Sequence, residues 1–175
     1  MSRLSLLALV FITFPARADN WPAWRGPTGQ GHSAETDLPL TWSATTNVRW
    51  KVPLADPGNS TPVIWGDRVF VTQANKGGTT RSLLCFARAD GKKLWQSDVG
   101  YADMEKNWNP SWYANASPAT DGERVVVSFG SAGVFCYDFT GKELWKRTDL
   151  GKWEHKFGNG ASPTNLPSPR APRRS

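Results

Sequence analysis

Histidines, glycine-rich segments and hydroxyl nucleophiles are the first places where this chain could do chemistry. His32 and His155 are its only histidines, and neither has a second histidine, a cysteine or a carboxylate at zinc-ligand spacing. Residues 26–31 are rich in glycine, but they neither follow a predicted strand nor open a helix, as a phosphate-binding loop would. No serine stands in a G-x-S-x-G turn. The sequence therefore predicts no catalytic residues, no metal ligands and no cofactor-binding residues.

The long connection over residues 101–115 is the best candidate for a binding function. It contains the run Asn107–Trp108–Asn109–Pro110–Ser111–Trp112–Tyr113. Binding residues concentrate in loops on rigid scaffolds, and aromatic side chains with a polar tip are common in binding surfaces. The alternative is that these rings simply pack over the end of the neighbouring strands.

Two asparagines match the glycosylation signal. Asn59–Ser60–Thr61 and Asn115–Ala116–Ser117 each precede a proline, and Asn159 falls in a similar place. Because the pattern recurs, we favour a structural role in which asparagine side chains bond local backbone at turns. Glycan attachment is the alternative.

Two stretches of the chain repeat one pattern of residue types, and that repeat determines the architecture. The first copy contains Ser60–Thr61–Pro62, Gly66–Asp67–Arg68–Val69–Phe70–Val71, Leu84–Cys85–Phe86 and Gly91–Lys92–Lys93–Leu94–Trp95. The second contains Ala116–Ser117–Pro118, Asp121–Gly122–Glu123–Arg124–Val125–Val126–Val127, Phe135–Cys136–Tyr137 and Gly141–Lys142–Glu143–Leu144–Trp145. A third copy opens at Ala161–Ser162–Pro163. A single unit of this kind cannot bury both of its faces, so two copies indicate part of an array.

Each repeat is predicted to fold as short antiparallel strands joined by tight turns. Runs of β-branched and aromatic residues alternate with turn residues such as Gly66–Asp67, Asp90–Gly91 and Thr140–Gly141. The tryptophans at 50, 95 and 145 recur at the length of one propeller blade. The sequence therefore predicts an all-β chain, a fragment of a β-propeller with two four-stranded antiparallel blades plus an N-terminal strand within residues 41–54.

The two cysteines occupy the same position in consecutive repeats. Equivalent positions on adjacent blades are normally too far apart for a disulfide, which needs Cα atoms within about 7 Å. We therefore expect Cys85 and Cys136 to be buried free thiols, with a disulfide in an oxidising compartment as the alternative.

Three features together resemble the pyrroloquinoline-quinone-like β-propeller repeat family of secreted bacterial proteins. They are the opening Trp21–Pro22–Ala23–Trp24–Arg25–Gly26–Pro27, the segment Val48–Arg49–Trp50–Lys51–Val52, and the Gly–Lys–x–Leu–Trp endings of both repeats. The resemblance implies that Trp95 and Trp145 are structural tryptophans that dock one blade against the next. It also implies a truncated propeller, because complete propellers have about 4–8 blades. In a complete ring, residues 41–54 would finish the last blade.

The ends of the chain carry separate signals. Arg3, an apolar run over residues 4–14 and Ala16–Arg17–Ala18 form a signal-peptide pattern, with cleavage after Ala18. The apolar run is too short to span a bilayer, so we expect no transmembrane segment after signal removal. The alternative is an uncleaved anchor. The chain carries a net charge of +6, but the signal and the tail contribute five of these charges. The body is nearly neutral, which predicts no nucleic-acid binding.

The domain organisation follows from these signals. Residues 164–175 contain three prolines and three arginines, which predicts a disordered tail that looks out of frame or misjoined. The predicted units are a signal peptide (1–18), an N-terminal segment (19–59), blade 1 (60–100), an inter-blade loop (101–116), blade 2 (117–151), the start of blade 3 (152–163) and the tail (164–175).

Two functions remain for the parent protein. The first is an exported, periplasmic or secreted propeller that binds or scaffolds an unknown protein or small molecule without catalysis. The alternative is a fragment of a quinoprotein alcohol dehydrogenase-like oxidoreductase. Family members that use the quinone resemble each other in having adjacent cysteines and a calcium site of Glu, Asn and Asp, and neither aligns with this chain. Fold alone does not make an enzyme. We therefore favour the non-catalytic reading, with no cofactor; a third possibility is that the chain does nothing by itself.

Overall fold

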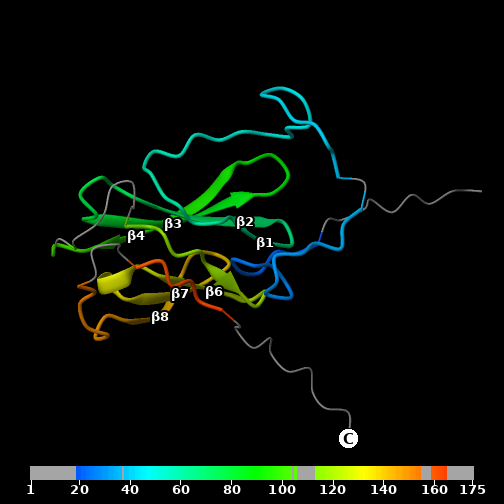
Figure 1. Cartoon of the computed structure of the whole chain (residues 1–175). Coiled ribbons are helices and arrows are strands. Elements are labelled where there is room, and N and C mark those ends of the chain that lie inside the picture. The colour runs from blue at the N-terminus through cyan, green and yellow to red at the C-terminus, as the bar shows by residue number, and fades with distance from the viewer. Residues whose placement is uncertain (1–18, 37, 104, 106–112, 155–158, 165–175) are drawn as a thin grey trace, which may run out of the picture.

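Two four-stranded antiparallel sheets make up the fold (Figure 1). The computed structural model describes residues 19–36, 38–103, 105, 113–154 and 159–164. The first sheet contains β1 (Val63–Trp65), β2 (Arg68–Ala74), β3 (Thr80–Ala87) and β4 (Lys93–Gly100). The second contains β5 (Ala119–Thr120), β6 (Arg124–Ser128), β7 (Val134–Asp138) and β8 (Glu143–Arg147), with a 3-10 turn, η1 (Gly130–Ala132), between β6 and β7. Each sheet is ordered as its strands follow in the chain, so the predicted all-β fold of two four-stranded blades is confirmed.

The registers of the two blades show that the sequence repeat is a structural repeat. In blade 1 Cys85 pairs with Phe70 and with Trp95, and in blade 2 Cys136 pairs with Val126 and with Trp145. Both blades carry a register shift immediately after the cysteine. Equivalent residues therefore lie on equivalent faces of the two blades.

The main core lies between the blades. One face of blade 1 meets the opposite face of blade 2, and the buried residues of this cluster are Val63, Phe70, Leu83, Cys85, Val99, Val125, Val127, Phe129, Ala132, Phe135 and Tyr137. Aromatic rings dominate the contact: Phe70 lies 6.0 Å from Trp95 and 5.2 Å from Phe139 between ring centroids. Aromatic pairs at such distances stabilise beyond the area that they bury.

The N-terminal part of the chain covers the other face of blade 1. Trp50 and Val52 pack against a second buried cluster of Val69, Leu84 and Phe86. Residues 41–54, where the sequence predicts a strand, contain no residue with strand pairing. A strand needs a hydrogen-bonded neighbour, and none of the described residues lies beside this segment as one. The segment contacts blade 1 through the side chains of Trp50 and Val52 instead.

Two tryptophans dock in the same way on successive blades. The indole Nε1 of Trp50 donates to the carbonyl oxygen of Arg88 at 2.9 Å, and that of Trp95 donates to the carbonyl oxygen of Phe139 at 3.0 Å. Each ring covers a turn glycine at positive φ: a Cβ would lie 2.7 Å from the Trp50 ring at Gly91 and 2.8 Å from the Trp95 ring at Gly141. Glycine suits both the backbone conformation and the close approach. Trp145, the third member of the series, is 43% exposed.

The strand registers define two ends of the molecule. Thr80 pairs with Gly100, and Val134 pairs with Ser128 and Arg147. The segments that leave these strand ends, including residues 75–79, 101–103, η1 and 148–154, therefore lie at one end, which we call the loop end. The tight turns that contain Gly66, Gly91 and Gly141 lie at the opposite end.

Candidate functional site

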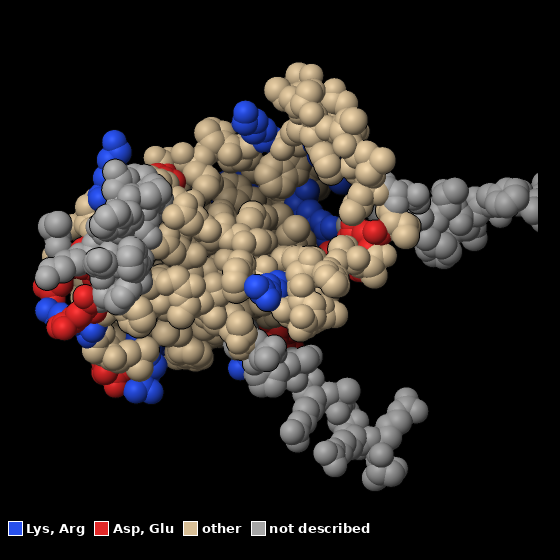
Figure 2. Space-filling view, viewed as in Figure 1, with Lys and Arg blue, Asp and Glu red and all other residues tan. Residues whose placement is uncertain are grey.

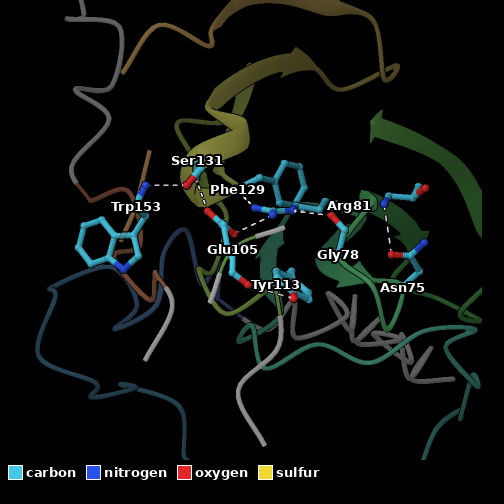
Figure 3. A network of polar contacts seen from close by, with 9 residues as sticks. Asn75, Gly78, Arg81, Glu105, Tyr113, Phe129, Ser131 and Trp153 are labelled. Carbon is cyan, nitrogen blue, oxygen red and sulfur yellow. Dashed lines mark hydrogen bonds and ion pairs between the residues drawn. The ribbon is translucent and has the colours of Figure 1, made fainter. Parts of the chain in front are cut away.

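A fully buried arginine organises the loop end (Figure 3). Arg81 lies near the start of β3, and its side chain is 1% exposed. Its Nε donates to the carbonyl oxygen of Gly78 at 3.1 Å, and its guanidinium also donates to the carbonyl oxygen of Phe129 in blade 2. Its guanidinium carbon lies 4.8 Å from the ring centroid of Tyr101 and 5.1 Å from that of Tyr113. One cation therefore joins both blades and the connection between them.

Glu105 is the partner of that cation. Its Oε2 accepts from the Arg81 guanidinium at 2.7 Å, and its Oε1 accepts from the backbone N–H of Ser131 in η1 at 2.7 Å. The Tyr113 hydroxyl donates to the backbone carbonyl of Glu105 at 3.3 Å. The Glu105 side chain is 9% exposed, so this is a largely desolvated ion pair with hydrogen bonds on both carboxylate oxygens. Both ends of the inter-blade connection are thereby held against the blades.

A pocket opens directly above this ion pair. It has a volume of about 320 Å³ and is lined by Tyr101, Asp103, Glu105, Ser131, Lys152, Trp153 and Glu154. The Ser131 hydroxyl accepts from the backbone N–H of Trp153 at 2.6 Å, which holds the chain after β8 at the rim. The pocket is therefore built by three segments that are distant in sequence: the start of the inter-blade connection, η1 and residues 152–154.

The charged rim of the pocket is exposed. Lys152 Nζ lies 2.6 Å from a carboxylate oxygen of Asp103. The hydrogen bond and negative charge of Asp103 raise the pKa of Lys152 above its ordinary value, so this lysine is a cation at neutral pH. Acidic and basic side chains alternate at this end of the molecule, on the left of Figure 2. With the rings of Tyr101 and Trp153, the rim offers hydrogen-bond acceptors, a cation and flat apolar faces.

This set of groups suits binding better than bond-breaking chemistry. Glu105 is engaged by a guanidinium and a backbone N–H, and Lys152 is engaged by Asp103. Among the described residues that line the pocket, no histidine, cysteine or serine is hydrogen-bonded to a base: Ser131 Oγ accepts a backbone N–H instead. Ser82 donates to the Asp98 carboxylate at 2.7 Å, but neither residue lines the pocket. A nucleophile or a general base needs such a partner within hydrogen-bond reach.

The sequence-based candidate loop lies only partly within the described residues. Residues 106–112, including Trp108 and Trp112, lie outside them. Tyr113 is described, and its ring packs on Arg81 at the end of the blade. The start of the same connection, Tyr101, Asp103 and Glu105, lines the pocket. The packing interpretation therefore describes Tyr113, while the binding interpretation stays a prediction, now for the part of the connection that lines the pocket.

Other candidate residues are placed elsewhere. His32 is exposed in the N-terminal segment, and His155 lies outside the described residues. The Asn59 side-chain amide donates to the Asn115 side-chain oxygen at 2.9 Å, which gives both glycosylation-signal asparagines a structural contact between repeat openings. Cys85 and Cys136 are free and buried, and burial raises the pKa of Cys85 to about 12. The expectation of two buried free thiols agrees with this.

Neither a metal cluster nor a membrane span is found in the part of the chain that the structure describes. No group of three or more His, Cys, Asp or Glu side chains in those ranges is placed to hold a metal ion. None of the described helical turns is long and apolar enough to cross a bilayer.

Sequence reasoning missed Arg81, Ser131, Lys152 and Trp153. Arg81 had a visible signal, because it is a charged residue at the start of a strand that is otherwise buried. The other three residues had none, because they meet Glu105 or the pocket only through the packing of blade 2 on blade 1.

Comparison with known proteins gives a family match and similar solved structures. The profile of the family described as outer membrane protein assembly factor BamB matches residues 34–148. No curated protein matches the chain. Among solved structures, the crystal structure of BamB from Moraxella catarrhalis is 25% identical with a TM-score of 0.40, and the match covers 57% of this chain and 26% of that one. The chain therefore spans about a quarter of the length of that protein.

Proposed function

This chain belongs to the family of outer membrane protein assembly factor BamB, whose β-propeller is built from pyrroloquinoline-quinone-like repeats, and from that premise we propose that it is part of an exported, non-catalytic propeller whose loop end binds a protein partner. The family description names outer membrane protein assembly, which supports a role in the cell envelope. Within that setting we propose that the chain is periplasmic or secreted. The signal-peptide pattern of residues 1–18 supports export. The chain itself supplies the site at which the partner would bind.

The pocket on the buried ion pair is the observation that carries this proposal. Binding surfaces work best when they are already in their bound shape, because ordering a loop on binding costs free energy. Arg81 and Glu105 fix the inter-blade connection from below, and Ser131 fixes residue 153 at the rim. The exposed rim then presents Asp103, Lys152 and the Trp153 ring to solvent.

The mixed character of the rim favours a protein over a nucleic acid or a small apolar ligand. Aromatic rings with exposed charges around them are typical of protein interfaces. The chain outside the signal and tail is nearly neutral, so it lacks the cationic surface that a phosphate backbone needs. A protein partner with both charge signs fits the Asp103–Lys152 pair best.

Site-specific photo-crosslinking in the native host tests the proposed site. A photoreactive amino acid replaces Trp153, which is 42% exposed at the pocket, or Leu94, which is 40% exposed on β4 and serves as the matched control. We expect one discrete crosslinked protein from position 153 and none from position 94. Asp103→Ala with Lys152→Ala in the same chain should reduce that product, because these side chains form the rim.

Two results would overturn the loop-end assignment. One is equal crosslinking from both positions, which would mean that contact follows exposure alone. The other is a product at position 153 whose yield does not change in the Asp103→Ala, Lys152→Ala chain, while circular dichroism shows that this chain is folded.

A further inference from the structure

The N-terminal segment of the described chain lies across the inner strands of both blades. Trp21 and β1 exchange two backbone hydrogen bonds: Trp21 N–H donates to the Ile64 carbonyl at 2.8 Å, and Ile64 N–H donates to the Trp21 carbonyl at 2.9 Å. Thr120 N–H of β5 donates to the carbonyl of Pro22 at 2.8 Å. The blue segment beside β1 and β6 in Figure 1 is this part of the chain. We call residues 19–35 the N-terminal strap.

The strap protects edges that would otherwise be open. β1 and β5 are the first strands of their sheets, so one edge of each has no neighbour within its own sheet. The Asn20 side-chain oxygen also accepts from Gly66 N–H at 2.8 Å, next to the end of β1. Unpaired strand edges invite association with other chains. The strap satisfies backbone groups on both blades at once.

The strap folds back on itself between its two ends. Gly26 N–H donates to the Ala23 carbonyl at 2.9 Å, and Gly31 N–H donates to the Arg25 carbonyl at 2.9 Å. A Cβ at Gly26, where φ is +71°, would lie 2.8 Å from the Trp21 ring. These turns return the chain to Glu35, which lies beside the first described residue.

One hydrogen bond closes the strap. The backbone nitrogen of Asp19 donates to Glu35 Oε1 at 2.6 Å. The backbone of Glu35 is held in a local turn, because its N–H donates to the Ser33 hydroxyl at 3.2 Å. Asp19 is the residue that follows the predicted signal cleavage point after Ala18.

We propose that removal of the signal peptide fastens the strap, because cleavage turns the Asp19 nitrogen into an ammonium group that pairs with the Glu35 carboxylate. The proposal rests on the export that the proposed function includes. A signal peptidase hydrolyses the Ala18–Asp19 peptide bond with one water molecule. Ala18 leaves as a carboxylate, and Asp19 keeps the amine, which takes up a proton from solvent.

The change of charge is the physical reason. In the uncleaved chain the Asp19 nitrogen is a neutral amide with one hydrogen. An α-amino group has an ordinary pKa of about 7.7–8.0, so after cleavage it is protonated at neutral pH. In the uncleaved chain only the carboxylate of this hydrogen bond is charged, whereas after cleavage donor and acceptor carry opposite charges, which adds a Coulomb attraction between them.

Processing therefore couples to the blades through the strap. When the Asp19–Glu35 contact holds both ends of the strap together, the backbone hydrogen bonds of Trp21 to β1 and of Pro22 to β5 should open less often than in the uncleaved chain. The contact is exposed, so the expected gain is modest: exposed ion pairs change an equilibrium by about two- to fivefold. The exported chain then has better protected inner edges than its precursor.

Hydrogen exchange on the two blades measures strap opening directly. Four chains are compared: one that begins at Asp19, one that begins at Ala18, and the Glu35→Gln variant of each. A removable fusion partner that leaves no extra residue supplies both N-termini. The amides of Ile64, Gly66 and Thr120 report the strap, because each donates to it. Glu123→Gln, an exposed glutamate on blade 2, is the control substitution.

We expect these three amides to exchange about two- to fivefold more slowly in the chain that begins at Asp19 than in the chain that begins at Ala18. Glu35→Gln should remove most of that difference, and Glu123→Gln should leave it unchanged. Equal amide exchange rates in the chains that begin at Asp19 and at Ala18 would overturn the proposal. So would a Glu35→Gln substitution that changes the exchange rates by the same factor in both chains.

The export premise is tested separately. Intact-mass analysis of the protein recovered outside the cytoplasm should give a chain that begins at Asp19. A different N-terminus would contradict the processing step, while the exchange experiment would still report on the ammonium–carboxylate pair. The two experiments therefore distinguish a wrong Asp19–Glu35 ion pair from a wrong assumption of export.

Discussion

Arg81 is the residue on which the loop end depends. Its guanidinium bonds Gly78 in its own blade, Phe129 in the next blade and Glu105 in the connection between them. Buried ion pairs add little net stability over an apolar pair, but removing one partner leaves an uncompensated buried charge. The pair therefore specifies how the loop end is arranged more than how stable it is.

Arg81→Met should destabilise the chain by about 3–5 kcal/mol, because it leaves the Glu105 carboxylate buried without its cation. Urea unfolding followed by circular dichroism measures this loss. Adding Glu105→Leu should recover a large part of it, since the second substitution removes the stranded charge. If the double variant lost the sum of the two single losses, Arg81 and Glu105 would not act as a pair.

The two cysteines give a second prediction for single residues. Burial raises the pKa of Cys85 to about 12 and that of Cys136 above its ordinary value. The thiolate is the reactive form, so both thiols should resist alkylation at pH 7.5 in the folded chain and react completely in 6 M guanidinium chloride. Mass spectrometry after iodoacetamide treatment measures this. Rapid labelling of either thiol without unfolding would contradict the buried placement.

At the scale of the elements, one docking contact occurs in two places and its tryptophan recurs in a third. Trp50 covers Gly91 of blade 1, Trp95 covers Gly141 of blade 2, and Trp145 has the same place in its blade but an exposed ring. The repeat openings follow the same rule: Thr61 N–H donates to Ser117 Oγ at 2.8 Å, and Ser117 N–H donates to Ser162 Oγ at 2.9 Å. Each unit is therefore related to the next by the same contacts.

Trp95→Ala and Trp145→Ala form a matched pair. Trp95→Ala should cost about 3–5 kcal/mol in this chain, the range for truncating a large core side chain, because it empties the contact between the blades. Trp145→Ala should cost less than about 1 kcal/mol, because its ring has no such contact among the described residues. In a longer propeller, in which a third blade covers it, we expect Trp145→Ala to cost as much as Trp95→Ala.

Chemical denaturation of both variants checks this pair. Equal losses in the 175-residue chain would contradict the docking account, since the two positions then would not differ in their surroundings. A loss below about 0.5 kcal/mol at Trp95 would mean that its ring contributes little to the contact between the blades.

The sequence repeat made the two blades predictable, whereas no sequence pattern predicted the pocket at the loop end. Periodic strands, turn glycines and the recurring tryptophans are local signals, and the structure has two four-stranded blades at these places. The segment at residues 41–54 lacks strand pairing because pairing depends on neighbouring strands, not on the segment itself. The Arg81–Glu105 pair was missed because its members are 24 residues apart and meet through η1 of the other blade.

At the scale of the whole molecule, the chain forms two blades of a propeller, for which we propose binding without catalysis. The matched part of BamB from Moraxella catarrhalis is about a quarter of that chain, so the partner and the complete ring remain proposals. A ligand on the axis of a propeller is held by groups from several blades, whereas the pocket at the loop end is built by two blades and the segments that leave them. That difference favours the proposed binding function over the dehydrogenase alternative.

The most direct test mixes the purified mature chain with pyrroloquinoline quinone and calcium and follows alcohol oxidation with a redox dye. We expect no turnover above a control without protein and no binding heat for either ligand, because a ligand on the axis of a propeller is held by groups from several blades and the described residues form two. Turnover that exceeds the control and is lost on calcium chelation would contradict the non-catalytic account and support a quinoprotein dehydrogenase.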